Sequence, residues 1–524
     1  MNLSVFTEND RRQIREHGLT EQQITKQLAL FEKGTPYVTL VRPCTAGDGI
    51  LRFDRNMHDA SVLRFEEKIR HRRLTKFVPA SGAATRMFKS LIKTYAATAQ
   101  SNPSGTGTRD GEDIKEDPEV KTFMNHIKRF AFYPDLRSSM AAMGKDLPDA
   151  VSRKQYQPIL EHLLTETGLN YAALPKGLIL FHAYGRENRT AFEEHLVEAA
   201  LYAAGADHTA DLHFTVSENH MDRFKQLLAD VRDRYESLFQ VRFNASFSIQ
   251  PKNTDTLAVD TANRPFRRAD GALLIRPGGH GALIGNLNRI QGDIIFVKNI
   301  DNVAHDRFKP EMTGWKKALA GHLLFLQEKT FNFVEKLHAA PVDPDTAEAA
   351  AGFLQNDLND HLGPDWSDLT PDEKQDALIN RLDRPIRVCG MVPNAGDPGG
   401  GPFWTKDDIG RVSLQIVETA QIDPKSDDQQ SMIRGLTHFN PVDIVCGVRN
   451  WKGEPFDLEK FVDPAAVFIT QKSEGGRDLK ALEHPGLWNG AMAHWHTVFI
   501  EVPAITFNPV KQVTDLLKKA HQPG

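Results

Sequence analysis

A short run of small residues that ends in an arginine is the first part of the chain whose residue types suggest chemistry. Residues 81–86 read Ser-Gly-Ala-Ala-Thr-Arg, between a predicted strand over 74–79 and a predicted helix over 87–97. Small side chains let backbone N–H groups approach an anion, and a helix N-terminus adds partial positive charge. The guanidinium of Arg86 would add a fork of donors for a phosphate. Taken alone, the segment favours a tight turn with a surface arginine.

Two polar segments follow predicted strands further along the chain. In residues 276–281, three glycines surround His280, which indicates either a close approach of a ligand to the backbone or a turn. A buried strand predicted over 293–298 runs into Asn-Ile-Asp-Asn at 299–302. Ligands bind at the carboxyl ends of strands in an open parallel sheet, and the carboxylate of Asp301 suits Mg²⁺ there. A strand-ending turn is the other interpretation, because Asn and Asp favour turns.

The same two segments also allow a dinucleotide-binding interpretation. Gly279, Gly281 and Gly285 follow a predicted strand and Asp301 ends the next one, which partly matches the fingerprint of NAD-binding proteins. The glycine spacing is one residue too long for that fingerprint, and the helix predicted over 282–290 is short. An NAD-type oxidoreductase therefore stays as an alternative.

Composition and charge narrow the class of protein. The 524 residues include 64 Lys plus Arg and 69 Asp plus Glu, a net charge of -5, which argues against a dominant nucleic-acid binder. No apolar run approaches the roughly 18 residues needed to span a bilayer, and the first residues do not resemble a signal peptide. The three cysteines, Cys44, Cys389 and Cys446, form no C-x-x-C and predict a reducing compartment. We expect a soluble cytoplasmic protein with neither nucleic acid nor membrane as a partner.

Alternating strand and helix patterns predict an α/β fold with a mostly parallel, helix-covered sheet. Further strands are predicted over 177–181, 211–217, 243–250, 271–275, 385–392, 411–418, 443–448 and 465–470, and further helices over 189–204, 219–236 and 510–520. Four parts are expected: a helical N-terminal prefix over 1–70, an α/β core over 71–310, a helical insertion over 311–383 and a second α/β half over 384–524.

Several short segments follow one another along the chain in an order that is typical of one group of enzymes. The set reads Ser81–Arg86, Pro175-Lys176, Pro277–Gly281, Asn299–Asn302, Val417–Ile422, Glu501–Pro503, Phe507–Lys511 and Asp515–Leu517. It resembles the motifs of the UDP-sugar pyrophosphorylases, within the nucleotide-diphospho-sugar transferase (GT-A) superfamily, over most of 74–303 and from 385 to the end. More closely, the chain resembles a bacterial family of similar length and unestablished function that is placed in that superfamily.

The resemblance implies a Rossmann-like GT-A fold, with 71–310 as the nucleotide-binding core and 384–524 as the sugar-side half. It implies Mg²⁺-dependent transfer of a nucleotide, from UTP in the first instance, to a sugar-1-phosphate, with release of pyrophosphate. The implied catalytic residues are Arg86 on the triphosphate, Lys176 at the α-phosphate and Lys511 on the sugar phosphate, with Asp301 as the metal ligand. The implied nucleotide-binding residues are Ser81, Gly82, Ala83, Thr85, Gln250, Gly278, Gly279, His280 and Gly281, and those for the sugar phosphate are Glu418, Asn489 and Lys511.

Some residues depart from the motifs or admit two interpretations. Ser81 and Ala84 stand where glycines are expected, and Gln421 replaces the second acidic residue of its motif. A catalytically silent protein that binds nucleotides or nucleotide-sugars is therefore an alternative of a different class. Trp488 belongs either to a sugar pocket or to a core cluster, and the loop 396–402 is predicted to border the sugar side. The sugar, the base preference and the oligomeric state stay open.

Overall fold

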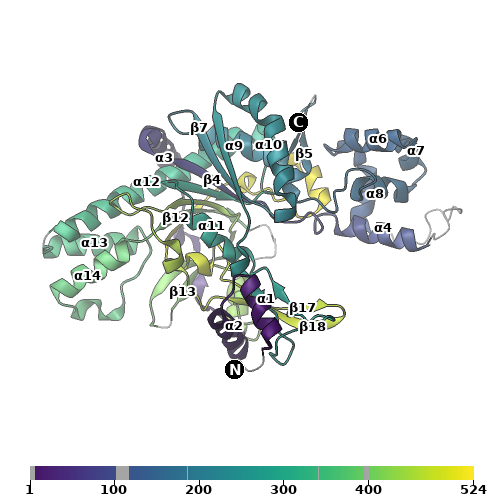
Figure 1. Cartoon of the computed structure of the whole chain (residues 1–524). Helices are drawn as coiled ribbons and strands as arrows, with labels where there is room; N and C mark the ends of the chain where they lie inside the picture. The colour runs from purple at the N-terminus through teal and green to yellow at the C-terminus, as the bar shows by residue number, and fades with distance from the viewer. Residues whose placement is uncertain are drawn as a thin grey trace. The chain divides into compact units, whose positions relative to one another are not determined.

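The computed structural model describes residues 6–101, 117–185, 187–339, 341–394, 396, 400–407 and 409–524. Its elements gather into two compact units, each assembled from separate stretches of chain (Figure 1). The first unit comprises Met1–Phe77, Ser248–Val297 and Lys317–Ala504, and the second comprises Val78–Phe247, Lys298–Lys316 and Ile505–Gly524. The division into four parts, argued above from the sequence, stays a prediction.

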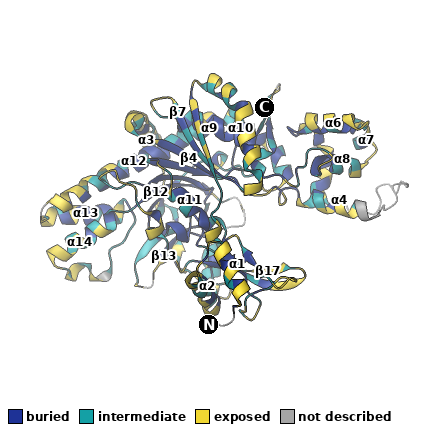
Figure 2. Cartoon of the chain, viewed as in Figure 1, coloured by how far each residue is buried: buried dark blue, intermediate teal, exposed yellow. Residues whose placement is uncertain are grey.

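A mixed sheet forms the centre of the first unit, with strand order β2-β3-β19-β12-β16-β11-β4. The strands are β2 Thr45–Ala46, β3 Gly49–Leu51, β4 Leu74–Pro79, β11 Ile294–Lys298, β12 Ile386–Pro393, β16 Asp443–Gly447 and β19 His496–Glu501. Neighbours β3–β19, β19–β12 and β11–β4 are parallel, whereas β12–β16 is antiparallel. The mostly parallel α/β sheet expected from the sequence is confirmed. Figure 2 shows how completely β4 and β12 are buried.

The second unit begins at Val78, so it includes the end of β4. Strands β7 Thr209–Thr215 and β8 Arg242–Ser248 follow in the order β4-β7-β8. Helices α9 Ala191–Tyr202 and α10 Met221–Phe239 belong with these strands, as does the ladder of β5 Leu180–Ala183 with β6 Asn188–Thr190. A group of helices completes the unit: α4 Lys89–Ser101, α5 Pro118–Asn125, α6 Tyr133–Ala142, α7 Leu147–Ser152 and α8 Tyr156–Leu164.

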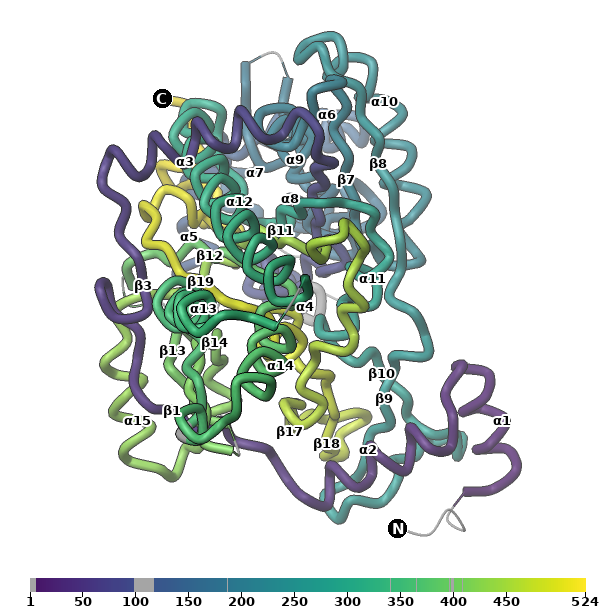
Figure 3. Tube along the Cα trace, turned by 90° about the vertical axis from the view of Figure 1, so that its left-hand side faces the viewer, coloured from purple at the N-terminus to yellow at the C-terminus, as the bar shows by residue number. Residues whose placement is uncertain are grey.

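Smaller elements surround the sheet of the first unit. The pair β9 Thr256–Leu257 with β10 Ile275–Arg276 lies beside the hairpin of β17 Phe468–Glu474 and β18 Arg477–Glu483, joined by backbone bonds between Val259 and Lys480 (Figure 3). A separate sheet has the order β1-β13-β14, from Thr39–Pro43, Gly401–Lys406 and Val412–Val417. Outside the predicted insertion, the helices described in the first unit are α1 Glu8–Glu16, α2 Glu21–Lys33, α3 Arg55–Lys68, α11 Ile284–Asn288 and α15 Asp427–Arg434.

The predicted insertion is helical. Helix α12, Lys309–Ala339, starts in the second unit and continues in the first, where α13 Pro344–Asn356 and α14 Pro371–Leu382 follow. Among the described helices, none is both long and apolar enough to cross a lipid bilayer.

Two sequence expectations about elements are corrected. The prefix over 1–70 is not wholly helical, because residues 39–51 form strands that pair with β13 and β19, far away in sequence. The segment 510–520 forms short 3₁₀ turns, Val513–Leu517 and Lys519–His521, in place of an α-helix. Lys518 has an extended backbone, with φ -64 and ψ 154, that separates the two turns, and distant side chains bind the carbonyls beside it: Arg129 donates to Leu517 and Arg307 to Lys519.

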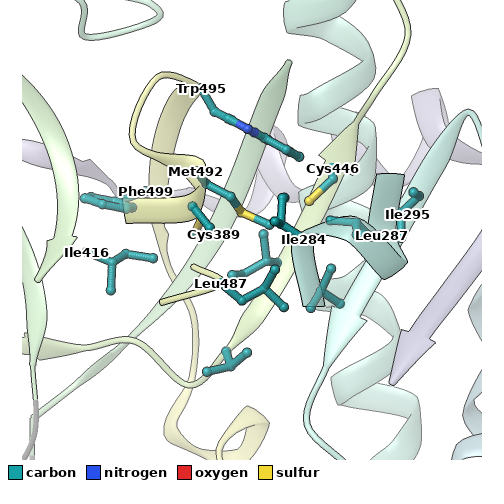
Figure 4. Packing of buried hydrophobic residues seen from close by; sticks show 14 of the residues in the cluster. Ile284, Leu287, Ile295, Cys389, Ile416, Cys446, Leu487, Met492, Trp495 and Phe499 are labelled. Carbon is teal, nitrogen blue, oxygen red and sulfur yellow. The ribbon is translucent and has the colours of Figure 1, made fainter. Parts of the chain in front are cut away.

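The core of the first unit packs around two cysteines that face it from neighbouring strands. Cys389 on β12 and Cys446 on β16 lie among Leu487, Met492 and Phe499 (Figure 4). All three cysteines of the chain are buried and free. Burial raises the pKa of the Cys389 thiol to about 11, so this thiol stays protonated and inert at neutral pH.

Candidate functional site

In the second unit, the small-residue loop lies directly against the segment that carries Lys176. The Ala84 N–H donates to the Leu174 carbonyl at 3.0 Å, and the Lys176 N–H donates to the Gly82 carbonyl at 3.2 Å. A β-bridge between Ala83 and Pro175 closes the contact. The structure therefore joins two segments that are about ninety residues apart in sequence. The backbone of the predicted anion-binding loop is hydrogen-bonded to the backbone of the predicted catalytic lysine.

Lys176 also contacts the predicted metal ligand and the C-terminal segment. Its Nζ lies 2.6 Å from Asp301 Oδ2 and donates to the Val510 carbonyl at 2.7 Å. The Val510 N–H in turn donates to the Asp301 carbonyl at 3.2 Å. The two charged side chains are 14% and 18% exposed, so the ion pair is shielded from solvent but still open to it. Four predicted segments, around 82, 176, 301 and 510, thus meet in one place.

The polar atoms at this place retain bonding capacity. An ammonium has three N–H donors, and Lys176 uses two of them within the described chain. Asp301 gives Oδ2 to the lysine, and within the same described residues Oδ1 accepts no hydrogen bond. No cluster of three or more metal-ligating side chains exists among the described residues. Mg²⁺ is commonly held by one or two carboxylates together with substrate phosphates, so a single carboxylate of this kind fits it.

The exposed loop residues are free to meet a ligand. Ser81, Gly82, Ala83, Thr85 and Arg86 are all exposed, while Ala84 between them is fully buried. A Cβ added at Gly82 would meet nothing within 4 Å, so the fold itself does not require glycine there. Arg86 forms no ion pair with any described residue. The N–H of Ala84 is already used, so it is not available to a phosphate.

Lys511 stands apart from the ion pair. Its side chain is exposed, and its Nζ lies 6.0 Å from the centre of the Phe507 ring. The structure thus brings the backbone next to Lys511, but not its ammonium, into contact with Lys176. Its assignment to the sugar phosphate stays a prediction.

The first unit carries a pocket of about 380 Å³. It is lined by Gly400, Ile416, Glu418, Thr419, Ala420, Phe439, Asn440, Val442 and Trp488. An aromatic ring, a carboxylate and an amide around one pocket suit the apolar faces and hydroxyls of a sugar. Residues 397–399 of the loop 396–402 lie outside the described residues, and Gly400 belongs to the pocket wall.

His280 connects two of the predicted residues at this pocket. Its ring stacks on Trp488 with 4.5 Å between centroids and an interplanar angle of 19°. His280 Nδ1 accepts the Leu487 N–H at 3.1 Å, so in the neutral ring the proton resides on Nε2. Nε2 lies 3.5 Å from Glu418 Oε1. His280, assigned from the sequence to the nucleotide, is therefore placed beside Glu418, which was assigned to the sugar phosphate.

Two buried asparagines keep unpaired polar atoms near this pocket. Asn440, 5% exposed and part of the wall, accepts the Val442 N–H on Oδ1, but its Nδ2 has no partner among the described residues. Asn489, 1% exposed, donates to the Ile416 carbonyl at 2.8 Å, and its Oδ1 is unpaired within the same part of the chain. An unpaired buried amide is costly unless a ligand or water completes it. Sequence reasoning missed Asn440; its position directly after the short strand β15, His438–Phe439, is the signal that could have found it.

The glycines at 278–281 are explained by packing within the first unit. A Cβ at Gly278 would lie 2.4 Å from the Thr254 carbonyl, and one at Gly281 would lie 1.9 Å from the Pro485 carbonyl. Gly279 has φ +80, a left-handed conformation that favours glycine. Gln250 donates to the Thr254 hydroxyl at 3.2 Å. The chain's own backbone therefore accounts for these glycines, and the contact of this loop and of Gln250 with a nucleotide stays a prediction.

A protein-family model matches almost the whole chain. The model for a domain of unknown function, DUF4301, matches residues 7–522. The chain belongs to the DUF4301 family. Among curated proteins, none matches it.

The comparison with solved structures gives matches of low identity. The chain is similar to UDP-glucose pyrophosphorylase from Leishmania major at 13% identity and a TM-score of 0.44, over 99% of this chain and 79% of that one. It is also similar to uridine diphosphate N-acetylglucosamine pyrophosphorylase from Trypanosoma brucei at 10% identity and a TM-score of 0.47, over 98% of this chain and 79% of that one. These identities and scores are low, so they carry no conclusion about activity.

Proposed function

We propose that this DUF4301 protein is a sugar-1-phosphate nucleotidyltransferase with a GT-A-type nucleotide-binding core. It would join a nucleoside triphosphate, UTP in the first instance, to a sugar-1-phosphate and release pyrophosphate. The observation that carries the proposal is the contact of Lys176 with both Asp301 and the Val510 carbonyl. That contact brings a cation, a carboxylate and the small-residue loop together, which is the combination that phosphoryl chemistry needs.

The chemistry asks little covalent work of the protein. A phosphate oxygen of the sugar-1-phosphate attacks the α-phosphorus, and the bond from the α-phosphorus to the oxygen that bridges it to the β-phosphate breaks. The third N–H of Lys176 neutralises charge on the α-phosphate, and Arg86 with the exposed loop around Gly82 holds the triphosphate. Such groups accelerate the reaction by positioning the reactants and by stabilising charge that develops in the transition state.

The proposed reaction also uses a divalent cation. Asp301 Oδ1 would hold Mg²⁺ together with phosphate oxygens of the nucleotide. When bound, the ion neutralises phosphate charge and polarises the phosphorus–oxygen bonds.

The sugar is assigned to the pocket of the first unit. Glu418 accepts hydrogen bonds from sugar hydroxyls, Asn440 Nδ2 donates to a hydroxyl oxygen, and the Trp488 ring offers an apolar face. The His280 Nε2–H that points toward Glu418 keeps that carboxylate in place. Because the sugar phosphate is ionised at neutral pH, the reaction needs no general base from this pocket.

The test is release of pyrophosphate by the purified chain with Mg²⁺, each of the four nucleoside triphosphates and a panel of sugar-1-phosphates. We expect release with one pair only, and we expect Lys176→Met to lower kcat by about a hundredfold or more. Lys93→Met, which removes an exposed lysine on α4, is the matched control and should retain full activity. Equal turnover by Lys176→Met and the wild type would overturn the assignment of Lys176.

One observation favours a second candidate function. Because the Ala84 N–H is taken by Leu174 and Ala84 is buried, the loop offers a phosphate fewer backbone donors than a glycine-rich loop would. A protein that binds a nucleotide or nucleotide-sugar without turnover would show thermal stabilisation by UTP or a UDP-sugar and no pyrophosphate release with any pair.

A further inference from the structure

A cluster of buried charged and aromatic side chains lies in the second unit, outside the residues assigned above. Glu194 on α9 is fully buried and binds two groups at once: His182 Nδ1 lies 2.8 Å from its Oε1, and Lys309 Nζ lies 2.5 Å from its Oε2. Tyr184 donates its hydroxyl to the same Oε1 at 2.7 Å. His182 Nε2 lies 2.8 Å from Nδ1 of His521, three residues before Gly524.

The partners of Glu194 come from the same three segments that form the Lys176 contact. His182 stands on β5, six residues after Lys176, and Lys309 stands eight residues after Asp301. His521 stands eleven residues after Val510. Each segment therefore has two anchors, one at the ion pair and one in the buried cluster.

Backbone contacts hold the tail between its two anchors. The Asn508 N–H donates to Asn302 Oδ1 at 2.8 Å, and Asn302 stands three residues before His305. The His305 N–H donates to the Ala520 carbonyl at 2.9 Å. A displacement of His521 therefore reaches the Asn508–Val510 backbone over a few covalent and hydrogen bonds.

The proton positions in the cluster follow from its charges. Burial by itself would raise the pKa of Glu194, but Lys309, His182 and Arg189 hold it well below its usual range, so Glu194 is ionised and only accepts hydrogen bonds. His182 then donates from Nδ1 and accepts on Nε2 in its neutral form. His521 must donate its Nδ1–H to that nitrogen.

We propose that Glu194, acting through His182 and His521, positions the Asn508–Val510 segment so that the Val510 carbonyl holds Lys176 beside Asp301. This inference rests on the proposed function for its catalytic consequence, but its structural part does not. These are positioning residues, because within the described structure they contact neither Lys176 nor Asp301. A wholly buried ion cluster is a poor source of stability, since the desolvation of its charges offsets their attraction. Fixing the geometry of three converging segments is a role that such a cluster fills well.

The test compares two substitutions at one position in the full-length chain. His521→Ala removes the ring and its hydrogen bond to His182, whereas His521→Asn places an amide N–H where Nδ1–H stands. Lys519→Ala, which truncates an exposed side chain in the same tail, is the control. His521 lies close to the end of the chain, and the thermal midpoint of each variant reports whether it remains folded.

The first readout is amide hydrogen exchange at Val510, whose N–H donates to the Asp301 carbonyl. We expect about tenfold faster exchange in His521→Ala, near wild-type exchange in His521→Asn and no change in Lys519→Ala. Unchanged exchange in His521→Ala, or equal acceleration by both His521 variants, would overturn the proposal. This readout decides the structural inference even if no pair of substrates releases pyrophosphate.

The second readout applies to the active enzyme. A misplaced Lys176 loses stabilisation of the transition state more than it loses substrate, so kcat should fall about tenfold or more in His521→Ala while KM for the triphosphate stays within about twofold. His521→Asn should regain most of kcat. A rise in KM with unchanged kcat would contradict the positioning role while leaving the nucleotidyltransferase assignment standing.

Discussion

At the scale of single residues, the space around a glycine shows whether the fold itself requires glycine at that position. Gly82 has open space where a Cβ would stand, whereas a Cβ at Gly281 would collide with the Pro485 carbonyl at 1.9 Å. We expect Gly82→Ala to leave the thermal midpoint within a degree or so but to lower turnover, because the methyl group obstructs a phosphate. Gly281→Ala should lower the free energy of unfolding by about 2 kcal/mol or more, since backbone must move. Urea unfolding and pyrophosphate release measure the two effects, and a fully active Gly82→Ala would remove the loop from the site.

The sequence names residues that the structure brings together, but it does not always supply the reason for them. Asp301 was predicted because a carboxylate after a buried strand suits Mg²⁺, and Lys176 because the resemblance implied it; their side chains lie 2.6 Å apart. The glycines at 278–281 were predicted for ligand contact, yet they pack against Thr254 and residues 484–485. The contact with 484–485 joins segments about two hundred residues apart, and no local pattern reveals it. The position of Asn440 after a short strand could have drawn attention to it, but the burial of its amide depends on the fold.

At the scale of elements, the start of α9 matters because this helix carries Glu194. Thr190 caps it in a capping box: the Glu193 N–H donates to the Thr190 hydroxyl, and the Thr190 N–H donates to Glu193 Oε2 at 2.8 Å. Thr190 is 6% exposed, so Thr190→Val, which keeps the shape and removes the hydroxyl, leaves a buried N–H unpaired. We expect a loss of about 2 kcal/mol in the free energy of unfolding.

The matched control is the exposed capping box of α14, where Thr370 plays the same part with Glu373. Water replaces the lost bond there, so Thr370→Val should cost about 1 kcal/mol or less. Equal losses in the two variants would show that burial of the α9 cap adds nothing.

Elements with a local signal were predictable, and those defined by distant partners were not. The strand over 74–79 and the helix over 189–204 are found in nearly the same places as β4 and α9, because buried apolar runs and a Thr-x-x-Glu start are read from neighbouring residues. Strands β1 and β3 were missed because they are short and pair with β13 and β19. The tail over 510–520 looked helical, but Lys518 is extended and the distant Arg129 and Arg307 bind the carbonyls on either side of it.

At the scale of the whole molecule, the acid response sums over buried histidines in both units. Burial lowers the pKa of His322 and of His496 in the first unit to about 4, and it lowers the pKa of His182 and His521 in the second. Unfolding exposes each of them with an ordinary pKa near 6.5. Below that pH the unfolded chain binds more protons than the folded one, so stability falls as the pH drops from about 6.5 toward 4.

His322 offers a clean test of this sum, because its ring packs edge-on against Phe53 at 5.3 Å and its Nε2 has no partner in the described chain. His322→Phe keeps an aromatic ring and removes the titration, so its thermal midpoint should fall less than that of the wild type between pH 7 and pH 4.5. Over the same pH range, the wild type should lose about 2 kcal/mol more of its free energy of unfolding than His322→Phe, since each unit of pKa shift is worth about 1.4 kcal/mol. The same substitution at the exposed His71 should leave the pH dependence unchanged. If His322→Phe and the wild type lose stability in parallel on acidification, the neutral buried state of His322 is wrong, and the acid response must arise from other groups.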